Sequence, residues 1–91
     1  MSVYEKGTKE VTTASILIVA ANPDREGIHL ATNDTDDVFL DFPATGVGLA
    51  VVQTGVILAT DVPVKIMGPL ARRAIYGITA ANTSTVAFQE L

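Results

Sequence analysis

Residues 14–32 read ASILIVAANPDREGIHLAT, and this stretch contains the signals that decide the fold. The run at 14–21 is apolar apart from Ser15, which is typical of a strand that is buried on both faces. The segment from Asn22 to Gly27 predicts a turn, because Asn-Pro pairs begin turns and Gly27 can supply a positive φ. In residues 28–32, Ile, Leu and Thr alternate with His and Ala, which is the period of a strand. The stretch therefore predicts a strand, a turn and a second strand.

Similar segments recur along the rest of the chain. Val, Ile and Thr together make up 29 of the 91 residues, and these β-branched side chains favour strands over helices. We therefore predict an all-β fold, a small single-domain β-sandwich or barrel of about seven short antiparallel strands. The further expected strands are 38–42, 49–52, 56–58, 62–66, 74–78 and 86–89.

Other local signals predict how the chain is organised. Residues 1–13 are polar and show no period, so we expect an extended N-terminal arm followed by one domain at 14–91. Pro63 predicts that its strand lies at a sheet edge or a bulge, since proline cannot donate to the hydrogen-bond ladder. The connection at 68–73 has room for one helical turn.

The size and composition of the chain indicate association. A chain of 91 residues buries only about 63% of its extended surface on folding. Small domains usually gain stability from disulfides, metals or oligomerisation, and this chain has no cysteine. Its residues are 48% hydrophobic and only 18% charged, against about 25% in typical domains. We therefore expect part of the apolar surface to form an interface.

Charge and sequence patterns exclude several partners. The net charge of −4 argues against binding of nucleic acid, which needs clustered Lys and Arg. Residues 42–60 carry no charge, but Pro43 and three glycines make this run a poor membrane helix, so no membrane is expected. The N-terminus is charged where a signal peptide needs an apolar stretch, so no export signal is expected.

One acidic segment resembles a binding site. The turn from Asn33 to Asp37 holds carboxylates that could ligate a hard cation, although the glycine and glutamate of an EF-hand loop are missing. The alternative is a solvated turn between two strands. His29 is expected on the outer side of its strand, with no serine or carboxylate partner close in sequence. We therefore expect no enzyme and no cofactor.

Five residues are candidates for an interface. Arg25 could pair with a carboxylate of a neighbouring subunit, or it could lie in an ordinary exposed hairpin. Arg72 and Arg73 could contact a partner, or they could lie in a solvated loop. Val3 and Tyr4 form an apolar pair in the polar arm and could anchor it to a neighbouring subunit, or the arm could be a disordered terminus.

Several segments in one order resemble a known class of protein. Ala20-Ala21-Asn22-Pro23 precedes Arg25 and Gly27, and the chain continues with TGVIL at 54–58, IYGITA at 75–80 and VAFQE at 86–90. This order resembles small virion proteins of tailed bacteriophages, with their AANPxR turn and closing IYGITA segment. The resemblance implies a β-sandwich or barrel of a capsid decoration (cement) protein or a head-fibre base, without catalytic residues. Residues 59–61 depart from the usual pattern of glycine and polar residues.

The resemblance leads to an expectation for the function. It implies a decoration protein that binds the major capsid protein of an assembled shell, and we expect it to form a homotrimer. The chain would be made in the host cytoplasm and would end on the capsid surface. The alternatives are a tail or neck component, a head-fibre base, and a cellular β-domain that binds a small ligand or a cation through its acidic turn.

Overall fold

The chain folds almost entirely into short strands. The computed structural model describes residues 6–32, 34, 36–43 and 56–91. Within these residues it has eight strands and one turn of 3-10 helix, η1. In chain order they are β1 (Lys6–Val11), β2 (Ile16–Val19), β3 (Gly27–Thr32), β4 (Val38–Asp41), β5 (Val56–Leu58), β6 (Val64–Met67), η1 (Pro69–Arg72), β7 (Ile75–Thr79) and β8 (Ser84–Glu90).

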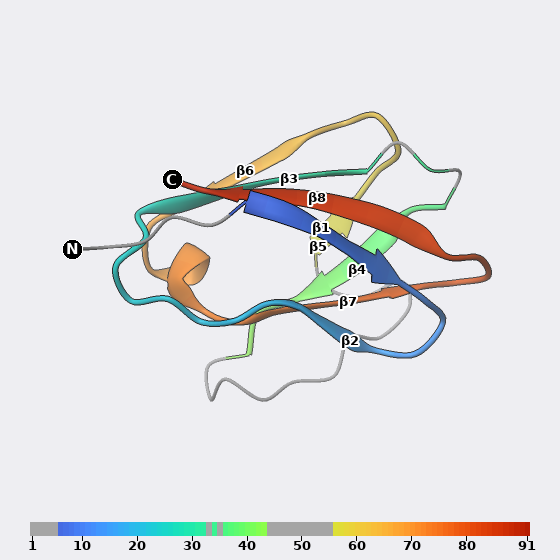
Figure 1. Cartoon of the computed structure of the whole chain (residues 1–91), viewed down its shortest axis with the longest axis horizontal. Helices are drawn as coiled ribbons and strands as arrows, with labels where there is room; N and C mark the ends of the chain where they lie inside the picture. Colours follow the sequence, from blue (N-terminus) through green and yellow to red (C-terminus); the bar gives the residue numbers. More distant parts are fainter. Residues whose placement is uncertain (1–5, 33, 35, 44–55) are drawn as a thin grey trace.

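These strands form two antiparallel sheets that lie face to face (Figure 1). The first, sheet A, has the order β1-β8-β3-β6, and the second, sheet B, has the order β2-β7-β4-β5. The prediction of an all-β sandwich or barrel is therefore confirmed, and the fold is the sandwich. Helix η1 lies at one end of the sandwich, and the turn between β7 and β8 lies at the other (Figure 1).

The core fills the space between the sheets. Each strand contributes alternate side chains, as the two-residue period requires. Sheet A supplies Val11, Ile28, Leu30 and Val86, and sheet B supplies Ile18, Val38, Leu40, Leu58 and Ile75, all of them buried.

The path of the chain crosses between the sheets at almost every connection. Among the described strands, only β4 and β5 are consecutive in sequence and paired with each other. Strand β8 lies between β1 and β3 and is in register with both, so that Ala87 lies opposite Thr8 on one side and Ala31 on the other. Residues far apart in sequence therefore meet throughout the fold.

The N-terminal segment differs from the expected arm. Residues 6–11 form strand β1, which pairs along its whole length with β8, and Val11 is fully buried. The expected boundary at residue 13 is therefore wrong for these residues. They look like an arm in the sequence because β1 is an edge strand, whose charged side chains stay in solvent.

Two details of the decisive stretch also differ from expectation. Strand β2 is an edge strand of sheet B with Leu17 38% exposed, so the apolar run at 14–21 is not buried on both faces. Gly27 does not have a positive φ. A Cβ there would lie 3.0 Å from the carbonyl oxygen of Ile66, a close contact with the backbone of β6 that glycine avoids. Glycine thus allows the close approach of β3 and β6.

Other predictions are confirmed. Pro63 directly precedes β6, which is an edge strand of sheet A, and the connection at 68–73 holds helix η1. The expected strand at 49–52 lies outside the described residues. Within the described ranges, no helix has the length and apolar character needed to cross a membrane.

Candidate interaction surfaces

Arg25 is fully buried at the end of the sandwich that η1 closes. Its guanidinium donates to Glu90 Oε2 on β8 at 2.9 Å, and the two side chains are 0% and 3% exposed. It also donates to the carbonyl oxygens of Ala20 after β2 at 3.0 Å, of Arg73 before β7 at 2.6 Å, and of Ala71 in η1. One cation therefore joins strand β8 of sheet A to the segment that follows β2 and to the segment that precedes β7, two strands of sheet B.

This arrangement corrects the role expected for Arg25. Its carboxylate partner is Glu90 of its own chain, and neither an exposed hairpin nor a contact with a neighbouring subunit describes it. Asn22 completes the cluster by donating from Nδ2 to Glu90 Oε2 at 2.8 Å. A buried charge is tolerable only when it is paired and hydrogen-bonded, and both conditions are met here.

The acidic turn follows β3 and lies at the end of the sandwich opposite to Arg25 and η1. Asp36 Oδ2 accepts the backbone N–H of Asn82 at 2.6 Å, and Asp34 Oδ2 accepts that of Thr85 at the start of β8. Asp37 Oδ1 accepts the backbone N–H of Thr60 at 3.2 Å. These carboxylates connect the turn to two other loops.

The same contacts bear on the proposed cation site. Each described carboxylate of the acidic turn accepts a backbone N–H group, from Thr60, Asn82 or Thr85, and so makes a structural contact. Within residues 6–32, 34, 36–43 and 56–91, no three metal-ligating side chains gather in one group. Asn33 itself lies outside this part of the chain. The described carboxylates have a structural role in joining loops.

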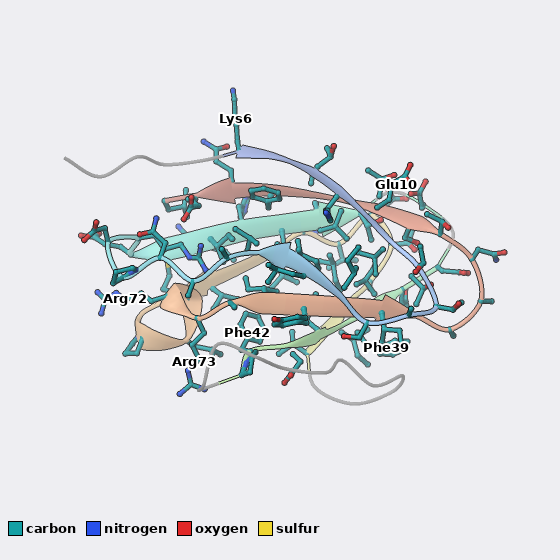
Figure 2. All side chains as sticks on the ribbon, turned by 60° about the horizontal axis from the view of Figure 1, so that its bottom comes forward. Lys6, Glu10, Phe39, Phe42, Arg72 and Arg73 are labelled. Atoms are coloured by element: carbon teal, nitrogen blue, oxygen red, sulfur yellow. The ribbon has the colours of Figure 1, made fainter. Side chains whose placement is uncertain are left out.

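The surface of sheet B that faces away from sheet A is mostly apolar, although the register also places Asp41 on it, opposite Tyr76. The registers place Leu17 opposite Tyr76, and place Phe39 between Ile78 and Ile57. These five side chains alternate with the core residues, so they point outward, and Figure 2 shows Phe39 on that side. Leu17 is 38% and Ile57 50% exposed, Tyr76 and Ile78 are half-buried, and Phe39 is buried at 8%. We call these five residues the apolar face.

The outer surface of sheet A has a different character. His29, Lys65 and Gln89 lie in one row and are exposed, so the expected orientation of His29 is confirmed. Next to this row lies an open groove of about 480 Å³, whose floor includes the small side chains of Ala31 and Ala87. We call this surface the groove face.

The remaining interface candidates lie on the surface or outside the described residues. Arg72 is the last residue of η1 and Arg73 follows it, and both are exposed (Figure 2). Arg72 Nε donates to the carbonyl oxygen of Arg25 at 3.1 Å, and an Arg73 η-nitrogen donates to that of Phe42 at 3.2 Å. Their contact with a partner stays a prediction, and Val3 and Tyr4 fall outside the described residues.

The sequence contained a signal for the apolar face that strand alternation alone misses. Residues 16–19 read ILIV and residues 38–40 read VFL, so the outward positions Leu17 and Phe39 are apolar, and Asp41 is the polar residue that follows on β4. In a strand with one face in solvent, every second residue is usually polar. An uninterrupted apolar run therefore places apolar side chains on the outer face too.

Comparison with known proteins identifies a structural likeness only. No protein family model and no curated protein matches the chain. A solved structure from the endospore appendages of Bacillus, which form disulfide-linked pili, superposes with a TM-score of 0.55 at 18% sequence identity. The match covers 97% of this chain and 84% of that one. At this identity the likeness concerns the fold.

Proposed function

We propose that this chain is a structural virion protein of a tailed bacteriophage, and specifically a capsid decoration protein that binds and stabilises the assembled head shell. The observation that carries the proposal is the apolar face. A sheet whose two faces are both apolar is normally covered on both sides. Exposed apolar patches on small proteins mark interaction sites. Burial of Leu17 and Ile57 against a partner would favour association of the domain.

Two further observations support an assembly role. The order of motifs in the sequence resembles that of phage virion proteins, and the same fold occurs in a protein of Bacillus appendages, which form pili. Those pili are disulfide-linked, whereas this chain has no cysteine, so its contacts would be non-covalent. The proposed role is structural and not enzymatic, the major capsid protein is the proposed shell partner, and a homotrimer on the capsid surface is the proposed assembly.

The test uses phage heads that lack the chain and purified protein added back. Decoration binds the assembled state in preference to free subunits, so the protein should sediment with heads and raise their resistance to heat. Electron microscopy should show added density on the head surface. Light scattering of the free protein should give a multiple of three chains per particle. Density on the tail, the neck or a head fibre would favour the alternative virion roles, and no binding to any particle would overturn the proposal.

Variants of the apolar face sharpen this experiment. Ile57→Lys and Leu17→Lys place a charge in a surface that must lose its water on binding, and each should weaken shell binding by about tenfold or more. Met67→Lys is the matched control, because Met67 is 52% exposed but lies on the other sheet. If all three variants lose the same amount of affinity for the shell, binding does not depend on the apolar face.

A further inference from the structure

The groove face carries its charges at its two ends. The strand registers align Lys6, Gln89, His29 and Lys65 in one row across all four strands of sheet A. Four residues further along β1 lies Glu10, opposite Thr85, and Asp61 lines the same end of the face. We call Lys6 and Lys65 the basic row and Glu10 and Asp61 the acidic row. Figure 2 shows Lys6 and Glu10 near opposite ends of β1, on the side away from sheet B.

Small side chains separate the two charged rows. Thr8, Ala87 and Ala31 lie opposite one another across β1, β8 and β3, and we call them the middle row. All three line the groove of about 480 Å³ beside the basic row. They also line an adjoining groove of about 370 Å³ that extends to Asp61. The middle of the face is therefore hollow, and a second surface can approach it closely.

We propose that the groove face binds the same face of a second copy of this chain, about a two-fold axis that runs along the middle row. Rotation about this axis exchanges the two ends of every strand. It therefore places Lys6 over the partner's Glu10 on the β1 side, and Lys65 over the partner's Asp61 on the β6 side. Each contact occurs twice, because a two-fold interface uses the same patch on both subunits.

The order of the charges selects this axis over the other face-to-face arrangement. A two-fold axis parallel to the strands would exchange the two edges of the sheet and keep the ends in place. Lys6 would then lie over the partner's Lys65, and like charges would repel. Only the axis across the strands brings unlike charges together at both edges of the sheet.

The distances also favour contact between copies over neutralisation within one chain. Four residues of strand separate the rows by about 13 Å, which exceeds the screening length of about 8 Å in physiological salt. Packed sheets lie about 10 Å apart, a gap that a lysine and a glutamate extending from opposite sides can close. Facing copies therefore supply each charged row with a partner.

This contact is independent of the proposed function, because it involves sheet A and needs no shell. A three-fold contact through another surface would combine with it into an assembly of six chains. The two proposals can fail separately, since shell binding is measured on phage heads and the two-fold contact on free protein.

The test is a charge exchange on β1, measured by sedimentation velocity of the full chain over about 1 to 200 µM protein. The unaltered chain should form a species of two chains, or a multiple of two, that dissociates on dilution and at high salt. Lys6→Glu should weaken this association by about tenfold or more, because the new carboxylate faces the partner's Glu10 in both of the symmetric contacts. The double variant K6E/E10K should restore it, since the exchanged charges again meet their opposites.

Lys9→Glu is the matched control. It makes the same charge change on the same strand, but Lys9 lies one residue off the row and faces the other side of β1. Its association should equal that of the unaltered chain, and circular dichroism should show all variants folded. A monomer throughout the concentration range, a failure of K6E/E10K to recover, or an equal loss in K9E would each overturn the proposal.

Discussion

The cluster around Arg25 shows how one side chain can hold two sheets together. Its donors are bound by the carboxylate of Glu90 and by three backbone carbonyl groups. One of those carbonyl groups follows β2 and the other two precede β7, and both strands are in sheet B. Glu90 belongs to sheet A. In a domain without disulfides, this cluster connects segments that are distant in sequence.

We expect Arg25→Met to destabilise the chain strongly. The variant leaves the carboxylate of Glu90 buried without its cation, which costs about 3 to 5 kcal/mol in comparable buried pairs. Chemical denaturation monitored by circular dichroism measures the free energy of unfolding. Lys9→Met, the same kind of change at an exposed site, should shift this free energy by about 0.5 kcal/mol or less.

A second variant separates the lost pair from lost packing. In R25M/E90M both charges are removed, so the unpaired buried carboxylate is absent and part of the stability should return. If R25M is as stable as K9M, the buried pair does not hold the sandwich together.

At this scale the sequence could not predict the role of Arg25. An arginine in a turn is usually exposed. The groups that bury this one are Glu90, Ala71 and Arg73, which lie 46 to 65 residues further along the chain. The acidic turn is similar, because its N–H donors come from other loops and no local pattern announces them.

Among the elements, β1 has the property that was hardest to predict. Its sequence, KGTKEV, contains three charges and one buried residue, Val11. Such composition is typical of an edge strand, where charged side chains prevent further pairing, but it is equally typical of a disordered terminus. The distinction depends on a free edge of β8, which the sequence of β1 does not reveal.

Removal of residues 1–11 should therefore destabilise the domain. The deletion exposes the edge of β8 and removes the burial of Val11, and together with the lost hydrogen bonds it should cost about 3 kcal/mol or more. Chemical denaturation tests this, and hydrogen exchange should show faster exchange of β8 amides. Unchanged stability would mean that these residues act as an arm after all.

Other elements were predictable because their signals are local. The alternation in residues 28–32, 74–78 and 86–89 predicted β3, β7 and β8, and Pro63 predicted an edge position for β6. The role of Gly27 was not predictable, because it depends on the approach of the Ile66 carbonyl oxygen from β6.

At the scale of the whole molecule, composition predicted association but not its location. The surplus of apolar residues indicated an interface. Only the pairing of the strands shows that Leu17, Tyr76 and Ile57 share one face, and that the lysines of β1 and β6 share a row on the other sheet. A sequence read strand by strand does not contain these neighbours.

Association should make the melting temperature depend on concentration. Subunits that bind only in the folded state stabilise it by mass action, so the melting temperature should rise by several degrees over a hundredfold increase in protein concentration. Differential scanning calorimetry measures this directly. The slope should be smaller for K6E than for K9E, and a melting temperature that is flat for the unaltered chain would show a domain that is stable alone.

The position of β8 has a consequence for folding during synthesis on the ribosome. This strand lies in the interior of sheet A, yet it is synthesised after the seven other described strands. While it is still inside the ribosome, β1 lacks its pairing partner and Arg25 lacks its counter-ion. Sheet A can therefore close only when translation has passed residue 90. Folding must then pair β1 with β8, which is distant in sequence, and such non-local pairing makes sandwiches fold in milliseconds to seconds.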